Sequence, residues 1–153
     1  MEIQKRARAI LDVFYKPEAI YLKEVISYNG NTRSISGRFV VPMLPSYSVL
    51  PINYVTAEQY IRSLSQLSYA LIGMLVEDGA IAFASFAEFK ILMTECRLYF
   101  MRTDLIYRRK ILREEAFEIT LTCRSDTELN GYRMCNLCVS GAVIRGELHF
   151  CGK

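Results

Sequence analysis

One stretch, residues 54–79, constrains the fold of this chain most strongly. Apolar side chains recur through it at helical spacing, which predicts an amphipathic helix with a broad apolar stripe. Thr56 and Gln59 form a capping-box pattern at its start, and Gly79 suits the C′ position at its end. We therefore expect a helix over residues 57–78 that is about 33 Å long, at about 1.5 Å per residue.

The opposite face of this helix carries polar and small side chains. On a surface helix such a face contacts water, whereas on a helix wrapped by a sheet it more often lines a pocket or a subunit contact. Both interpretations stay open from the sequence. The side chains concerned are Gln59, Arg62, Ser63, Gln66, Tyr69, Ala70 and Gly73.

Composition favours a single domain over residues 1–153, with more apolar surface than one core needs. Hydrophobic residues make up 52% of the chain, above the usual share. No apolar run is long enough to span a bilayer, so we expect no stable membrane insertion. The excess then indicates an oligomer interface or an apolar ligand.

The net charge of the chain limits the classes of binding partner, and the N-terminal residues indicate the cellular compartment. A formal net charge of +3 is too small to indicate nucleic-acid binding. The first ten residues lack the apolar core of a signal peptide, so a cytoplasmic location is expected.

The five cysteines do not predict a metal or redox site. Cys135 and Cys138 are three residues apart in a stretch with a strand pattern, so they should point to opposite faces of a sheet. We expect neither a metal nor a cofactor.

The order of elements predicts an α+β domain. A short amphipathic helix within residues 1–17 precedes two strands joined at Asn29-Gly30, a strong hairpin signal. A proline-rich irregular segment leads into the central helix, residues 56–78 with its cap. Strand candidates follow at residues 90–102, 114–124, 131–140 and 143–151, whereas residues 81–89 fit either a strand or a turn of helix.

This order resembles the hot-dog fold, in which a long antiparallel sheet curves around one central helix. Within that superfamily of acyl-CoA thioesterases and dehydratases, the chain is most similar to the FcoT-type fatty acyl-CoA thioesterases. The resemblance covers about residues 20–150. It rests on Gly37-Arg-Phe39, Tyr47, Ser65-Gln-Leu-Ser-Tyr69 and Gly146-Glu-Leu148. It implies a homodimer that binds acyl thioesters of coenzyme A or acyl carrier protein.

Hot-dog hydroxyacyl dehydratases have a histidine before the helix and a carboxylate four residues before a helical glutamine. With Gln66 aligned on that glutamine, Arg62 stands at the carboxylate position. The single histidine, His149, falls in the last strand candidate. Dehydration by that mechanism is therefore not expected.

Thioester hydrolysis requires a polarised carbonyl and an activated water. The free N–H groups near Ala57 and Glu58, at the helix start, can polarise a carbonyl. Glu58 is the candidate base. The same residue is also ordinary in a first helical turn, where it can form an i,i+4 pair with Arg62.

The acyl group is expected beside the helix start and along the helix face that carries polar and small side chains. The candidate substrate-binding residues are Tyr47, Asn53, Tyr54, Thr56, Ser63, Gln66, Ala70 and Gly73.

A basic cluster between strands is the candidate phosphate site, because guanidinium groups bind phosphate in a bidentate manner. A solvated loop is the alternative interpretation. The cluster comprises Arg108, Arg109, Lys110 and Arg113.

Two functions follow from the sequence. The first is a thioesterase for long-chain fatty acyl thioesters. The second is a non-catalytic acyl-CoA-binding hot-dog protein that lacks the dehydratase histidine and carboxylate.

Overall fold

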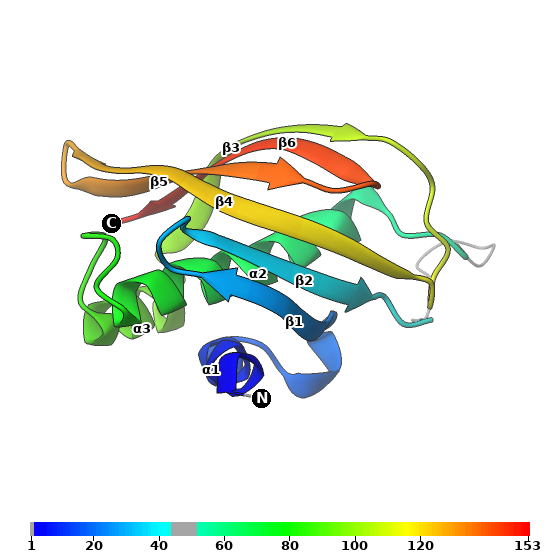
Figure 1. Cartoon of the computed structure of the whole chain (residues 1–153), viewed down its shortest axis with the longest axis horizontal. Helices are drawn as coiled ribbons and strands as arrows, with labels where there is room; N and C mark the ends of the chain where they lie inside the picture. The colour runs from blue at the N-terminus through cyan, green and yellow to red at the C-terminus, as the bar shows by residue number, and fades with distance from the viewer. Residues whose placement is uncertain (1, 44–51) are drawn as a thin grey trace.

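A computed structural model describes residues 2–43 and 52–153 of the chain. Its centre is a six-stranded antiparallel sheet in the order β1-β2-β4-β5-β6-β3. The sheet curves over the long helix α2, as Figure 1 shows. The strands are β1 (Leu22–Asn29), β2 (Ser34–Val40), β3 (Leu98–Tyr107), β4 (Ala116–Leu129), β5 (Tyr132–Ser140) and β6 (Ile144–Gly152).

Helix α2 (Ala57–Glu77) confirms the predicted central helix. Asp78 is its C-cap and Gly79 adopts the expected positive φ of 66°. At the other end, Thr56 is the N-cap, and Gln59 Oε1 accepts the Thr56 N–H at 2.9 Å. The Thr56 hydroxyl makes no cap hydrogen bond, so the glutamine is the stronger half of this capping box.

Two further helices cover the side of α2 that faces away from the sheet. Helix α1 (Glu2–Leu11) and helix α3 (Phe86–Thr94) approach α2 closely at Gly73. A Cβ atom at that position would lie 2.8 Å from Ile10 Cδ1 and 2.9 Å from Phe89 Cε1. Helices α1 and α3 therefore complete the enclosure of α2, whose other side is covered by the predicted curved sheet.

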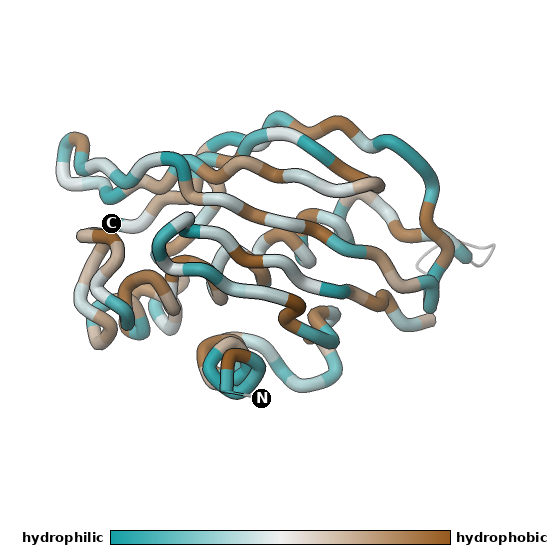
Figure 2. Tube along the Cα trace, in the orientation of Figure 1, coloured by the Kyte–Doolittle hydropathy of each residue, from teal (hydrophilic) through white to brown (hydrophobic). Residues whose placement is uncertain are grey.

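Alternation along the strands places one face of the sheet on the core. Figure 2 shows apolar and polar residues alternating along the strands, and β2 and β5 have alternating burial. On β5, Cys135 is buried whereas Cys138 is only partly buried, as expected for residues on opposite faces. Within residues 2–43 and 52–153, no three His, Cys, Asp or Glu side chains gather as a metal site requires.

The predicted hairpin at Asn29-Gly30 forms, and a second Asn-Gly pair, Asn130-Gly131, forms another hairpin with a different turn. Asn130 and Gly131 have φ of 54° and 76° and join β4 directly to β5, as a two-residue hairpin requires. The β1–β2 loop is longer, and its positive φ falls on Arg33 instead of Gly30. There, the Asn29 side chain accepts the N–H groups of Asn31 and Thr32.

The strand expected over residues 90–102 is wrong in its first half. Those residues belong to α3 and to the turn that follows it, and β3 begins at Leu98. Ser85 and Glu88 cap the helix reciprocally, with Glu88 Oε2 accepting the Ser85 N–H at 2.8 Å. This Ser-x-x-Glu pattern is a capping-box signal that was readable in the sequence.

The two edges of the sheet differ. At the β1 edge, Gln4 of α1 accepts the Val25 N–H at 2.6 Å, so the N-terminal helix protects that strand. At the other edge, no described strand pairs with the outer side of β3. Several apolar side chains of β3 are exposed, namely Tyr99, Met101, Ile106 and Tyr107. In the described part of the chain, no helix is long and apolar enough to cross a membrane.

Candidate active site at the start of helix α2

A groove with a volume of about 830 Å³ lies at the N-terminal end of α2. It brings together the chain entering the helix, the first turn of the helix and the basic segment after β3. Among the described residues, the groove is lined by Ile52, Tyr54, Val55, Thr56, Ala57, Tyr60, Tyr107, Arg108, Arg109 and Lys110.

Backbone pairing explains why the basic segment lies beside the helix start. Tyr54 and Leu112 form an isolated antiparallel bridge, and the Val55 N–H donates to the Ile111 carbonyl at 2.9 Å. The Arg113 N–H in turn donates to the Asn53 carbonyl at 2.9 Å. This pairing places the basic segment beside the helix start, although the two are more than fifty positions apart in the sequence.

The basic residues of the groove differ in their contacts. Lys110 Nζ lies 4.7 Å from the centre of the Tyr54 ring, a cation–π arrangement. Arg109 donates to Glu115 at 3.0 Å. A hydrogen bond from the Leu112 backbone N–H and the Arg109 guanidinium lower the pKa of Glu115, so it is a carboxylate at neutral pH.

The helix start provides polar groups on the groove side. The first helical hydrogen bond runs from the Tyr60 N–H to the Thr56 carbonyl at 3.0 Å. The N–H groups of Ala57 and Glu58 precede it and have no carbonyl within the helix to bond. Because Ala57 lines the groove, these donors and the positive end of the helix dipole lie at its wall.

The structure places Glu58 beside the groove and not in it. Its carboxylate pairs with Arg62 at 3.1 Å, and its side chain is 70% exposed. Glu58 is not among the residues that line the groove. The ordinary i,i+4 pair is thus present, and a role as base stays a prediction.

The polar stripe farther along α2 packs against other parts of the protein in this structure, so its role in ligand binding stays a prediction. Ser63, Gln66, Ala70 and Gly73 are all buried. Ser63 donates to the Gln59 carbonyl at 2.9 Å, and the Gln66 amide bonds the backbone of residues 19–22. The sequence could not show which segment would cover this stripe.

The remaining predicted residues divide between the groove and its surroundings. Tyr54 and Thr56 line it, together with Arg108, Arg109 and Lys110. Asn53 is exposed and Arg113 is buried, and neither lines the groove. Tyr47 lies outside the described residues.

Sequence reasoning missed two tyrosines of the groove. Tyr60 is buried and packs against Tyr107, with ring centroids 5.3 Å apart. Its place in the first helical turn, next to the cap, was the available signal. Tyr107 ends β3 and had no such signal.

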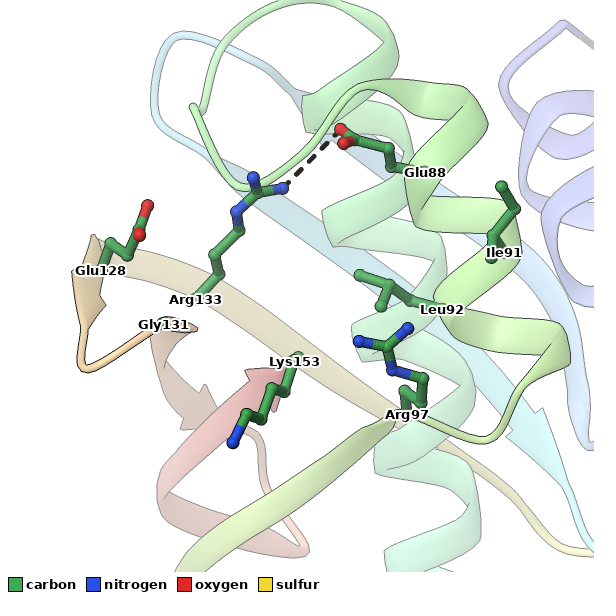
Figure 3. Close-up of a pocket in the computed structure, with 9 residues that line it drawn as sticks. Glu88, Ile91, Leu92, Arg97, Glu128, Gly131, Arg133 and Lys153 are labelled. Atoms are coloured by element: carbon green, nitrogen blue, oxygen red, sulfur yellow. Dashed lines mark ion pairs between the residues drawn. The ribbon is translucent and has the colours of Figure 1, made fainter.

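A smaller pocket of about 270 Å³ lies where α3 meets the β4–β5 hairpin, at the other end of α2 (Figure 3). Its three cations already have partners. Arg133 lies 3.7 Å from Glu88, Arg97 pairs with Glu95, and Lys153 stacks on the Tyr132 ring. We therefore place the candidate site at the larger groove.

No family model matches the sequence, and no curated protein matches it. A mutant thioesterase from Pseudomonas aeruginosa matches with a TM-score of 0.54 and 9% identity, covering 97% of this chain and 91% of that one. A hypothetical thioesterase from Streptococcus pneumoniae, solved with coenzyme A, matches at 0.53 and 8% identity, covering 99% and 96%. The dehydratase heterocomplex ApeI:P from Xenorhabdus doucetiae matches at 0.56 and 10% identity, covering 92% and 88%.

The chain has the hot-dog fold. At sequence identities this low, structural similarity shows the fold and not the chemical activity. A relation to the FcoT-type thioesterases is therefore a proposal. In this hot-dog domain His149 lies on β6, where it is paired with Arg102 and Asn136 across the sheet.

Proposed function

We propose that this hot-dog protein binds long-chain fatty acyl thioesters of coenzyme A or acyl carrier protein and hydrolyses them. The proposal includes a cytoplasmic homodimer of the FcoT type. The observation that carries it is the groove itself, which joins the start of α2 to Arg108, Arg109 and Lys110. A helix start suits a carbonyl oxygen and a basic segment suits phosphate, and an acyl-CoA presents both.

Each part of the ligand has matching side chains in the groove. Arg108 and Lys110 would bind the phosphates, and the N–H groups at Ala57 would polarise the carbonyl. The acyl chain would lie along the apolar wall formed by Ile52 and Val55. The acyl chain would not pass beside Gly73, because Ile10 and Phe89 occupy that space.

The fold supports the ligand class. Two of the compared hot-dog structures are thioesterases by name, and one of them was solved with coenzyme A. For this chain, acyl-CoA and acyl carrier protein are both candidates, since each presents phosphate next to a thioester.

The proposed dimer would form along the free edge of β3. An unpaired strand edge readily adds another strand, and Met101 and Ile106 expose apolar surface there. The β1 edge is protected by Gln4 and is less suitable. Because β3 ends at Tyr107 in the groove, the partner subunit would lie close to the site.

For hydrolysis, a carboxylate must activate water. Glu58 is the proposed base, next to Ala57 at the helix start. Glu115 is a second carboxylate close to the groove, held by Arg109 and the Leu112 N–H. Comparing Glu58→Gln with Glu115→Gln would assign the base, because the amide keeps the shape and removes the charge.

A specific observation also favours the non-catalytic alternative. None of the described residues that line the groove is a carboxylate, and Glu58 is paired with Arg62. A binding protein would use the same carbonyl and phosphate contacts without releasing thiol.

Incubation of the purified full chain with palmitoyl-CoA separates these functions. Release of free thiol supports the thioesterase, whereas saturable binding in calorimetry without release supports the binding protein. Lys110→Gln should weaken binding, and Lys90→Gln is its control because Lys90 also stacks on an aromatic ring, 4.5 Å from Phe86. A wild-type chain that neither binds nor cleaves palmitoyl-CoA or palmitoyl carrier protein would refute the proposal.

A further inference from the structure

The Tyr60 hydroxyl differs from those of the other buried tyrosines in the described chain. Tyr60 is only 3% exposed, and its hydroxyl has no hydrogen-bond partner among the described residues. Tyr21 accepts a hydrogen bond from Arg62 at 2.9 Å, and Tyr69 donates to the Leu98 carbonyl at 3.3 Å. Buried tyrosine hydroxyls usually have a partner, because leaving one unpaired is unfavourable.

Aromatic packing fixes the Tyr60 ring at the wall of the groove. The Tyr60 ring packs against Tyr107 and Phe117, with centroid distances of 5.3 and 5.4 Å. Tyr60 lines the same groove as Thr56 and Ala57, in the first turn of α2. The residue that carries the unpaired hydroxyl therefore lines the same groove as the start of the helix, with its free N–H groups.

The hydroxyl is a proton donor at neutral pH. Burial raises the pKa of Tyr60 to about 12. The charged or titratable groups that act on it are Arg109, which lowers this pKa, and Glu115 and Tyr107, which raise it. The phenol thus keeps its proton and offers a neutral O–H.

We infer that the Tyr60 hydroxyl donates a hydrogen bond to the carbonyl oxygen of the bound acyl thioester. The inference rests on the proposed function and adds a second donor to the N–H groups at Ala57. It makes Tyr60 a substrate-contacting residue that sequence reasoning did not single out as part of the site.

A carbonyl suits this donor better than a phosphate does. A phosphate carries full charge, and the basic residues Arg108 and Lys110 are available for it at the groove wall. Tyr60 is neutral and enclosed by aromatic rings, where a charged oxygen would lose much of its hydration. One neutral acceptor oxygen satisfies the hydroxyl without that cost.

In hydrolysis the same hydrogen bond would strengthen as negative charge develops on the oxygen. Water adds to the carbonyl carbon and gives one proton to the base, while the carbonyl π electrons move to the oxygen. The carbonyl then re-forms and the C–S bond breaks, releasing thiolate, which takes up that proton. The products are the fatty acid and the free thiol, and Tyr60 keeps its own proton throughout.

A matched pair of ligands tests the contact without requiring turnover. The first is a ketone analogue of palmitoyl-CoA, in which CH₂ replaces the thioester sulfur and the carbonyl remains. The second is hexadecyl-CoA, a thioether without the carbonyl. Tyr60→Phe should weaken binding of the ketone about five- to tenfold, the effect of one ordinary hydrogen bond, and leave thioether binding unchanged.

Thermal unfolding of the free protein separates this role from a structural one. Tyr60→Phe should melt at the parent temperature or above, since it removes an unpaired buried hydroxyl. Tyr69→Phe is the control on the same helix, and it should lower the melting temperature without discriminating between the two ligands. If turnover occurs, Tyr60→Phe should lower kcat more than it changes KM.

The outcomes distinguish this inference from the function on which it rests. If the parent binds both ligands and Tyr60→Phe weakens neither, or weakens both equally, the inferred contact is wrong and the proposed function stands. If the parent binds neither ligand nor palmitoyl-CoA, the proposed function fails, and the contact fails with it. Should Tyr60→Phe not fold, the ¹³Cζ resonance of Tyr60 in the parent provides the test. It must shift with the ketone and not with the thioether.

Discussion

The backbone N–H of Tyr21 donates to Oε1 of Gln66 at 2.9 Å, which joins the start of β1 to the middle of α2. The same oxygen accepts the Leu22 N–H at 3.2 Å, and Gln66 Nε2 donates to the Ala19 carbonyl at 2.7 Å. One buried amide thus satisfies three backbone groups at a point where the sheet begins. These contacts explain why the Gln66 side chain is buried between α2 and the start of β1 and does not line the groove.

Gln66→Leu should therefore destabilise the protein strongly. The apolar side chain keeps most of the volume and leaves two N–H groups and one carbonyl without partners. Unpaired buried groups cost about 1–3 kcal/mol each, so we expect a loss of roughly 3 kcal/mol in urea unfolding. Normal stability combined with lost acyl-CoA binding would contradict this and return Gln66 to the ligand site.

The cap of α2 leads to a second prediction. Because Gln59 accepts the Thr56 N–H and the Thr56 hydroxyl makes no cap hydrogen bond, Gln59→Leu should cost about 1 kcal/mol. Thr56→Ala should cost less than the ~1 kcal/mol usual for an N-cap side chain. Urea unfolding of the two variants gives the order, and a larger loss for Thr56→Ala would show that its hydroxyl is the main cap.

The sequence predicts an element of this fold well where the residues that determine it are close together in the sequence. Both ends of α2 have local signals, Thr56 with Gln59 and then Gly79, and the helix forms where they place it. The Asn130-Gly131 turn is local in the same way. Helix α3 was missed although Ser85 and Glu88 cap it, because the apolar run after them also fits a strand.

The candidate site depends on contacts between distant parts of the chain, which the spacing of residues in the sequence cannot reveal. Tyr54 meets Leu112 only after the chain has folded, and this bridge brings the basic segment to the helix start. Gln66 and Tyr21, 45 residues apart, decide that the polar stripe is covered by protein. The basic cluster and the helix start were predicted separately, and only the structure joins them.

Gly73 leads to a third prediction, about packing. Gly73→Ala improves helix propensity by about 1 kcal/mol, but its Cβ would overlap Ile10 and Phe89, which costs about 1–3 kcal/mol. We expect a net loss of about 1 kcal/mol in urea unfolding. Ile10→Val removes Cδ1, the nearest atom, so it should cost less in the Gly73→Ala background than in the parent. Additive losses would contradict the contact.

A fourth prediction concerns acid. The Leu112 N–H and Arg109 lower the pKa of Glu115 below its ordinary 4.5, so the folded protein binds this proton more weakly than the unfolded chain. The resulting stabilisation is complete above about pH 4.5 and is lost as the pH falls through the folded pKa. Glu115→Gln should flatten the pH dependence of unfolding in that range. The substitution should not abolish this pH dependence, because hydrogen bonds with Ser85 lower the pKa of Glu88 in the same way.

The free edge of β3 leads to the last prediction, which tests the proposed dimer. Met101 is 59% exposed on this edge strand, and a lysine there would place a charge where a second copy would pair. Met101→Lys should reduce the mass in sedimentation from two chains to one while the circular dichroism spectrum stays that of the parent. Leu129→Lys is the matched control, since Leu129 is 58% exposed at the far end of β4 and should leave the mass unchanged. A parent protein that already sediments as one chain would refute the dimer. A Met101→Lys variant that still sediments as two chains would show that the subunits pair elsewhere.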